Sequence, residues 1–162
     1  FLNSNHLQGS GKSHIKIGLF YKNNLVSVMT FQKGDISKNI SDWELNRFCS
    51  LVGTNIIGGA SKMLKYFLTM NKDVTKIISY SDNRWGRGNV YGNMGFVKTS
   101  SGVPNYWYLK FPEIKRNHRY SLRKNKSDDV NKTEWENRVG QGYDRIWDCV
   151  SSKWEFNRLN EN

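Results

Sequence analysis

The first fifty residues carry the two-residue hydrophobic period of β-strands. In the stretch HIKIGLFY the apolar positions alternate with polar or small ones: Ile15, Ile17 and Leu19. Asn23 and Asn24 then give a turn signal, and the run LVSVMTFQK that follows is rich in β-branched and aromatic residues. The pattern predicts a β-hairpin over residues 14–33 and a third strand in WELNRFCSLV.

Downstream, the period changes to that of a helix. Gly58 and Gly59 end a loop, and the apolar residues after them recur at helical spacing: Met63, Leu64, Phe67 and Leu68. KIISYSD is typical of a buried strand, NVYGNMGF of a short helix that ends at Gly95, and NYWYLKF of another strand.

Beyond Pro112 the composition changes to a basic, polar stretch. NKTEWENRVGQG predicts a helix capped by Asn131 or Thr133, and YDRIWDCVSSKWEF predicts a terminal hairpin or strand pair. The order of elements, with antiparallel strands first, indicates an α+β fold rather than a doubly wound one.

The charge balance restricts the expected partners. The chain has 162 residues and a formal net charge of +11, so we expect a partner with dense negative charge, nucleic acid before an anionic membrane. No apolar run approaches the roughly 20 residues that cross a bilayer, and no signal peptide opens the chain. Cys49 and Cys149 are too few for a disulfide framework, which favours a reducing, intracellular compartment. Because the first residue is Phe1 rather than Met, we expect a further segment upstream.

The stretch GSGKS (9–13) has the composition of a nucleotide phosphate loop. The Walker A pattern also requires a glycine where this chain has His6, and a helix where the pattern here predicts a strand. An ATP site is therefore excluded at this position. We expect a polar loop in which Lys12 could touch a nucleic-acid phosphate.

A second stretch, NIIGGASKML (55–64), fits a phosphate better because it follows a strand and opens a helix. Its two glycines and Ala60 remove side chains where a phosphate would approach the backbone. The first N–H groups of the helix would face the anion, and Lys62 adds positive charge. An ordinary glycine turn at the start of a helix is the alternative.

Two motifs on these elements resemble the GNAT family of N-acyltransferases. Asn55 to Ala60, N-x-x-G-G-A, is similar to the family's Q/R-x-x-G-x-G/A pyrophosphate loop, with asparagine in place of the usual glutamine or arginine. Downstream, a strand followed by a helix that ends in Y-x-x-x-G-F matches at Tyr91, Gly95 and Phe96. Over nearly its whole length the chain looks like a GNAT-like domain of phage proteins. That domain is attached to homing-endonuclease-like proteins and is distantly similar to Mom-like DNA-modifying proteins.

The resemblance implies a mixed, mostly antiparallel central sheet with helices on both faces. The sheet would be shortened at its N-terminus, because only about 13 residues precede the hairpin. The resemblance also implies a core over residues 1–112 and a basic C-terminal extension over residues 113–162 that packs on the core. The context it implies is the cytoplasm of a bacterial host, with a nuclease domain upstream.

The same resemblance assigns a donor site and an acid–base set. Acetyl-CoA or another acyl-CoA would bind at the glycine turn and at one position beyond it: Asn55, Gly58, Gly59, Ala60, Ser61, Lys62 and Asn83. Glu44 is the candidate base, Tyr91 the candidate acid, and Asp82 would orient the amine. Structural roles are the alternatives: an ion pair of Glu44 with Arg47, a core position for Tyr91, and turn caps for Asp82 and Asn83.

No metal site is predicted. His6, His14 and His118 are scattered, and no Cys/His spacing matches a zinc site. Four acidic residues in the tail could hold Mg²⁺ in a nuclease: Glu134, Glu136, Asp144 and Asp148. The context NKTEWE instead favours a helix N-terminus, where glutamate is stabilised by the dipole.

The basic surplus is concentrated in two stretches that also hold aromatic residues, Trp85 in the first and Trp107, Tyr108 and Tyr120 in or beside the second. Together with the first loop they supply the predicted nucleic-acid contacts: Lys12, Arg84, Arg87, Lys115, Arg116, Arg119, Arg123 and Lys124. Arginine and lysine neutralise phosphates, and aromatic rings can stack on unpaired bases. A solvated charged loop is the alternative.

Two functions therefore remain open. The chain could be an enzyme that uses acyl-CoA to modify a nucleobase or another amine. It could also be a DNA-binding module without chemistry that guides an attached nuclease.

Overall fold

The computed structural model describes residues 1–34, 43–113 and 115–158. Its larger part, which we call the body, is a six-stranded sheet in the order β1-β2-β3-β4-β9-β5. The strands are β1 (Ile15–Tyr21), β2 (Asn24–Lys33), β3 (Trp43–Ser50), β4 (Lys76–Asp82), β5 (Val97–Ser101) and β9 (Ser151–Asn157). All neighbouring pairs are antiparallel except β3 and β4. The predicted α+β class, with a mostly antiparallel sheet, is confirmed.

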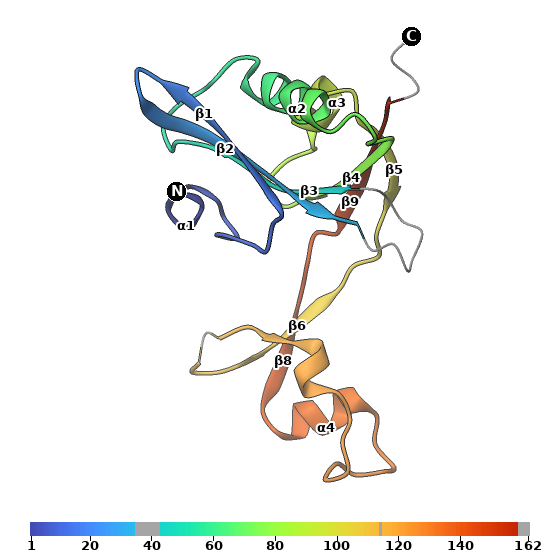
Figure 1. The fold of residues 1–162 in the computed structure, drawn as a ribbon. Helices are drawn as coiled ribbons and strands as arrows, with labels where there is room; N and C mark the ends of the chain where they lie inside the picture. Colours follow the sequence, from blue (N-terminus) through green and yellow to red (C-terminus); the bar gives the residue numbers. More distant parts are fainter. Residues whose placement is uncertain (35–42, 114, 159–162) are drawn as a thin grey trace.

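Three helices belong to the body: α1 (Leu2–Asn5), α2 (Gly59–Met70) and α3 (Asn89–Asn93). Figure 1 shows α2 and α3 together on one face of the sheet and α1 on the opposite face. None of the helices in the described ranges is both long enough and apolar enough to span a bilayer.

The first hairpin forms as predicted, with a two-residue turn at Lys22 and Asn23. Both residues have positive φ, 46° and 65°, as a type I′ turn requires. Tyr21 pairs with Asn24 at the end of the ladder. The turn therefore lies one residue earlier than the asparagine pair suggested.

β3 and β4 are hydrogen-bonded over only two residue pairs, Trp43 with Ile77 and Glu44 with Ile78. Beyond these pairs the two parallel strands diverge. In the same region the register of β3 against β2 shifts, so that Asn46 is the extra residue of a β-bulge between the partners of Thr30 and Phe31. The divergence opens the sheet at its centre.

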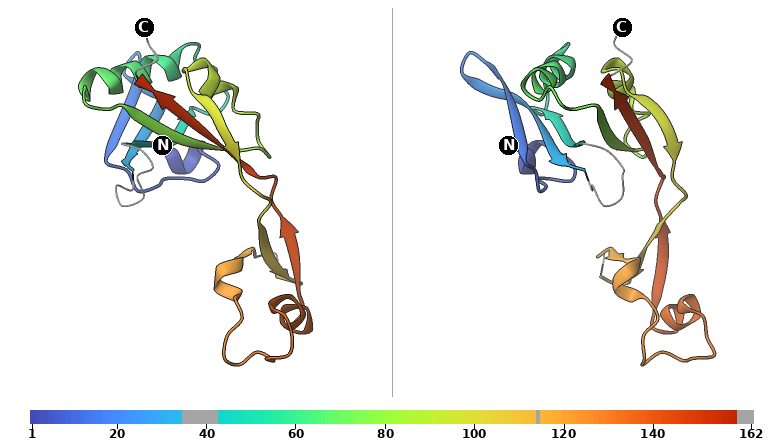
Figure 2. Two further views of the ribbon diagram at one scale, coloured as in Figure 1. Left: turned by 90° about the vertical axis from the view of Figure 1, so that its right-hand side faces the viewer. Right: turned by 45° about the vertical axis from the view of Figure 1, so that its right-hand side comes forward.

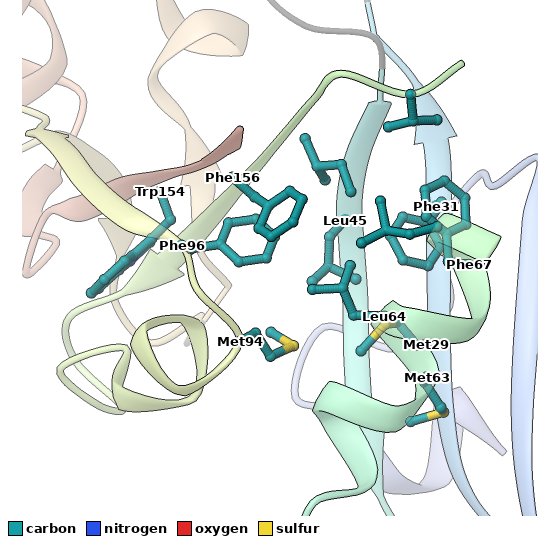
Figure 3. Close-up of a cluster of buried hydrophobic side chains, with 13 residues drawn as sticks. Met29, Phe31, Leu45, Met63, Leu64, Phe67, Met94, Phe96, Trp154 and Phe156 are labelled. Atoms are coloured by element: carbon teal, nitrogen blue, oxygen red, sulfur yellow. The ribbon is translucent and has the colours of Figure 1, made fainter. Parts of the chain in front are cut away.

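A continuous hydrophobic core joins both halves of the sheet on the α2 and α3 side (Figure 3). The buried stripe of α2, with Met63, Leu64 and Phe67, packs on Phe31 and its neighbours. The rings of Phe31 and Phe67 are stacked with centroids 3.7 Å apart. The other half of the core consists of residues from the α3 region and β9: Met94, Phe96, Trp154 and Phe156.

Residues 105–148 form a second unit, which we call the small lobe. It contains β6 (Tyr106–Lys110), β7 (Asn117–His118), the 3₁₀ helix η2 (Arg119–Leu122), α4 (Glu134–Gly140) and β8 (Tyr143–Trp147). Its three strands form a separate sheet in the order β7-β6-β8. The lobe projects from the body on the two segments that connect β5 to β6 and β8 to β9 (Figures 1 and 2).

A buried ion pair stabilises the small lobe. The guanidinium of Arg138 on α4 donates to both carboxylate oxygens of Asp128 at 2.7 Å and to the carbonyls of Leu122 and Arg123. Thr133 caps α4 through a reciprocal pair of hydrogen bonds with Glu136, so Thr133 rather than Asn131 is the N-cap.

The prediction of a terminal hairpin is wrong. β8 pairs with β6 in the small lobe, whereas β9 enters the body between β4 and β5. The chain turns between them at Val150, whose φ of 68° interrupts the extended conformation. Residues 151–157, expected in the C-terminal extension, thus form an interior strand of the body sheet, and β6, expected in the core, belongs to the lobe.

Candidate functional site

The divergence of β3 and β4 contains a cleft with a volume of about 1020 Å³. One wall is the bulged part of β3, at Asn46, Arg47 and Phe48, and another is the end of β4 with the loop that follows it. The remaining walls come from residues 6–8, from the start of α3, and from Trp107, Lys115 and Arg116 of the small lobe. The cleft thus brings together segments that are far apart in the sequence.

Tyr91, the predicted acid, lines this cleft from α3. Its ring stacks on Trp154 with centroids 5.5 Å apart, and its hydroxyl donates to the carbonyl of Tyr80 at 3.2 Å. Burial raises the pKa of Tyr91 above its ordinary value of 10.0, so the phenol is protonated at neutral pH. The side chain therefore has both a packing role and a proton that it can donate.

Asp82 also lines the cleft, at the end of β4. Its Oδ2 accepts from Nη2 of Arg84 at 2.9 Å, and its Oδ1 accepts from the backbone N–H of the same residue. The loop that follows β4 therefore begins with an Asx turn reinforced by an ion pair. Asp82 can orient a cation only by sharing its carboxylate with Arg84.

Glu44, the predicted base, is not one of the residues that line the cleft. It sits in the short paired part of β3, opposite Ile78 of β4, where the strands have not yet diverged. Burial raises the pKa of Glu44, an effect that the positive charge of Arg47 opposes. The strand was predicted correctly, but the place where it separates from β4 could not be predicted.

His6 is a titratable residue of the cleft that the sequence analysis did not assign to a site. It follows α1, and its Nδ1 accepts from the backbone N–H of Gln8 at 3.1 Å. Burial, and to a lesser degree the charge of Arg47, lower the pKa of His6 below 6.5. The imidazole is therefore neutral at pH 7, and its acceptor nitrogen Nδ1 is the one that holds the hydrogen bond from Gln8.

Arg47 is the second residue of the cleft that was missed as a site residue. Its guanidinium donates to the carbonyls of Gly9 and Asn46, which fixes the loop of residues 9–13 against β3. The β-bulge aims Arg47 toward this loop, and no local pattern in the sequence marks a bulge. The position of His6 is equally non-local, because it depends on how α1 packs under the sheet.

The glycine turn before α2 has the conformation that its residues suggested. Gly58 is the N-cap with φ of 72°, a region that favours glycine. A Cβ on Gly59 would lie 2.8 Å from the side chain of Ile56, so any larger residue there would have to displace Ile56. The N–H groups of Ala60 and Ser61 belong to the first turn, where a helix offers no partner of its own.

The turn does not line the cleft, but it lies close to it through α3. The Ser61 hydroxyl is 3.5 Å from the carbonyl oxygen of Asn93, the last residue of α3. Lys62 is exposed on the first turn of α2, and Asn55 is exposed in the preceding loop. The candidate phosphate-binding turn and the cleft thus lie at opposite ends of α3.

Asn83, the remaining donor-site candidate, has a structural role. Its backbone N–H donates to the carbonyl of Val150 at 3.0 Å, and its Oδ1 accepts from the hydroxyl of Ser152 at 2.8 Å. It therefore joins the end of β4 to the start of β9 and is not among the residues that line the cleft.

Half of the predicted nucleic-acid contacts lie at the cleft: Arg84, Arg87, Lys115 and Arg116. All four side chains belong to exposed residues, two from the loop after β4 and two from the small lobe. Lys12 does not line the cleft, although its carbonyl accepts from the side chain of Asn46 at 2.6 Å.

The remaining predicted contacts, Arg119, Arg123 and Lys124, belong to the small lobe. They differ in whether the charged group is engaged by the protein itself. Arg123 lies 3.5 Å over the ring of Tyr120, and Arg119 lies 5.5 Å from the ring of Tyr106. Both residues are exposed. The ammonium of Lys124 donates to the carbonyls of Val130 and Lys132 and so holds the loop before α4.

The acidic residues of the tail are used within the lobe and do not converge. Glu134 accepts from the hydroxyls of Tyr106 and Tyr108, Glu136 completes the cap of α4, and Asp148 accepts from two backbone N–H groups. Within residues 1–34, 43–113 and 115–158, no group of three His, Cys, Asp or Glu side chains could hold a metal ion.

Comparison with known proteins adds no assignment: no protein-family model matches the sequence, and no curated protein matches it significantly. The function must therefore be argued from the cleft and its surroundings.

Proposed function

We propose that the chain is a GNAT-like N-acyltransferase domain of the phage type that acts on DNA. In this proposal the cleft holds the thioester of an acyl-CoA together with an amine of the nucleic acid. The observation that carries the proposal is the divergence of β3 and β4 after two residue pairs, with a glycine turn and a helix directly after β3. The strand order of the body and the parallel β3–β4 pair support the resemblance seen in the motifs.

The divergence suits the CoA arm because it leaves strand edges without strand partners. Past Glu44 and Ile78 the facing edges of β3 and β4 are separated by the cleft. An extended ligand that carries amides can pair with such edges, as an added strand does. The pantetheine arm of CoA has two amides, and its pyrophosphate would reach the first turn of α2, where Gly58 has open space at the position of a Cβ.

The cleft also holds the groups that acyl transfer needs. The amine must lose a proton, attack the thioester carbon through its lone pair, and expel the thiolate, which takes a proton as the C–S bond breaks. His6, neutral at pH 7, would accept the first proton in place of Glu44 at Nδ1, where the amine displaces the hydrogen bond from the N–H of Gln8. Tyr91 supplies the second proton, and Asp82 orients the amine.

The acceptor is assigned to DNA because of the charge around the cleft. Five cationic side chains from both units line it, the half-buried Arg47 and four exposed ones, and Asp82 is its one carboxylate in the described residues. Since Asp82 neutralises only Arg84, the net charge of the side chains that line the cleft remains positive. Phosphates of a bound strand would neutralise it.

The alternative is a DNA-binding module that performs no chemistry and guides an upstream nuclease. This alternative is favoured because two of the predicted catalytic side chains already form hydrogen bonds within the protein. The hydroxyl of Tyr91 donates to the backbone of Tyr80, and the carboxylate of Asp82 is occupied by Arg84. In that case the cleft would bind nucleic acid only.

Calorimetric titration with acetyl-CoA separates these two functions. Binding with heat is expected for the wild-type protein, and Lys62→Ala should weaken it roughly tenfold through the loss of one charge-assisted phosphate contact. Lys65→Ala is the matched control, because Lys65 is exposed one turn further along α2.

No heat with acetyl-CoA, together with salt-sensitive DNA binding, would leave only the module. Equal losses in Lys62→Ala and Lys65→Ala would show that α2 contributes charge without a phosphate site at its start.

A further inference from the structure

Two tryptophans reach the cleft from the two units of the molecule. Trp85 follows β4 in the body, and Trp107 lies on β6 in the small lobe. Trp85 is 64% exposed, and Trp107 is half-buried. Neither belongs to the core cluster of the body, so the packing of that core does not explain why both indoles lie at the cleft.

Each indole has its own guanidinium. Arg84 lies 5.9 Å from the ring of Trp85, and Arg116 lies 5.9 Å from the ring of Trp107. The rings of His118 and Trp107 form a T-shaped contact with centroids 4.9 Å apart. The cleft thus repeats one arrangement twice, a flat aromatic face beside a permanent positive charge.

A ligand that uses both features has flat aromatic groups joined by anionic ones. Nucleotides have this chemistry, since bases stack on indoles and phosphates bind arginine. A duplex cannot use the indoles, because its base faces are stacked on one another and only phosphates and groove edges are accessible. Only unpaired bases can therefore stack on the two indoles.

We propose that the cleft binds an unpaired stretch of nucleic acid, with bases stacked on Trp85 and Trp107 and phosphates on Arg84 and Arg116. This rests on the proposed action on DNA and specifies its form: the acceptor amine is presented by a single-stranded or extruded nucleotide. In this arrangement the small lobe supplies half of the binding surface.

The test is fluorescence anisotropy with one labelled DNA strand of about 16 nucleotides, used free and annealed to its complement. The free strand should bind more tightly than the duplex, and binding should quench tryptophan fluorescence. Trp85→Ala should weaken binding of the free strand roughly 5- to 150-fold, the range for one lost stacking contact, and leave duplex binding unchanged. Trp107→Phe, which keeps an aromatic ring, should lose less affinity than Trp107→Ala.

Trp147→Ala is the matched control. Trp147 is 56% exposed on β8 of the small lobe and does not line the cleft, so its removal should not change the affinity for either form of DNA. Thermal unfolding of each variant shows whether its fold is intact.

Each other outcome has a distinct meaning. Equal or tighter binding of the duplex, or unchanged binding in Trp85→Ala and Trp107→Ala, would overturn the stacking proposal and leave the action on DNA standing. No binding of either form at low salt would overturn both. Displacement of the strand by saturating CoA would show that the indoles hold the adenine of the donor instead, and this too would overturn the proposal.

Discussion

Single side chains in the cleft combine a structural contact with a chemical capability. Tyr91 stacks on Trp154 and donates to a backbone carbonyl, yet it also lines the cleft with a phenol that burial keeps protonated. His6 lines the same cleft, and its lowered pKa keeps the imidazole neutral at pH 7. A residue of this kind is distinguished from a purely structural one by a substitution that keeps the ring and removes only the proton.

Tyr91→Phe is that substitution. The variant should fold and bind acetyl-CoA as the wild-type does, because the stacking on Trp154 is preserved. If Tyr91 donates the proton to the leaving thiolate, the rate of transfer should fall roughly 10²- to 10⁴-fold. The measurement is release of free thiol from acetyl-CoA in the presence of single-stranded DNA.

The control for this substitution is Tyr66→Phe on the exposed side of α2. The pH dependence has a defined sign: since the pKa of Tyr91 is raised above 10.0, loss of its proton should reduce the rate only above pH 10. An equal rate in wild-type and Tyr91→Phe would remove the phenol from the mechanism.

At the scale of elements, the sequence predicts single helices and strands, but it does not predict which strands pair with one another. The hairpin, α2 and α4 follow from turn residues, apolar spacing and a capping box, all of which lie within a few residues of one another. The alternating pattern of residues 151–157 also predicts a strand, but it does not indicate that this strand pairs with β4 and β5. The positions of Tyr91 and Asp82 were predictable because Tyr91 lies in a short local helix and Asp82 at the end of a strand, whereas the absence of Glu44 from the cleft lining depends on where β3 leaves β4.

The loop before α4 depends on one buried ion pair, and this gives the small lobe a pH dependence of its own. Hydrogen bonds from Arg138 and from the backbone of Asn125 lower the pKa of Asp128 to about 2. Because the folded-state pKa is lower than the ordinary 3.8, the pair stabilises the lobe above about pH 4. This stabilisation should be lost as the pH falls from about 4 towards 2, and hydrogen exchange of the α4 amides should then accelerate.

Asp128→Asn should give fast exchange in α4 already at neutral pH, because it leaves the buried guanidinium of Arg138 without a counter-charge. Asp129→Asn is the matched control, since Asp129 is exposed and its bridge to Lys132 is 3.6 Å long. Wild-type behaviour of Asp128→Asn would mean that the backbone carbonyls around Arg138 suffice to hold the loop.

At the scale of the whole molecule, the two units contribute to one surface. The body supplies Arg84, Arg87 and Trp85 to the cleft, and the small lobe supplies Lys115, Arg116 and Trp107. The net charge of +11 acts on a partner from a distance, but only the cations at the cleft can fix its position.

The salt dependence of DNA binding distinguishes long-range attraction by the net charge from direct phosphate contacts at the cleft. If four cations at the cleft contact phosphates of a single strand, the logarithm of the affinity should fall with the logarithm of salt concentration with a slope of about −3. Arg87→Ala should reduce the slope by about 0.7. Lys98→Ala, an exposed lysine of β5 outside the cleft, should leave the slope unchanged. A slope that both variants change equally would indicate diffuse charge attraction rather than a site.

The connection of the small lobe also has a consequence for biosynthesis. β9 lies inside the body sheet, between β4 and β5, although the ribosome synthesises it only after the whole lobe. Until then β4 and β5 have no strand between them, and Phe96 lacks its contact with Phe156. In the described part of the chain, the strands of the lobe pair only with one another, so the lobe can form before β9 closes the body sheet.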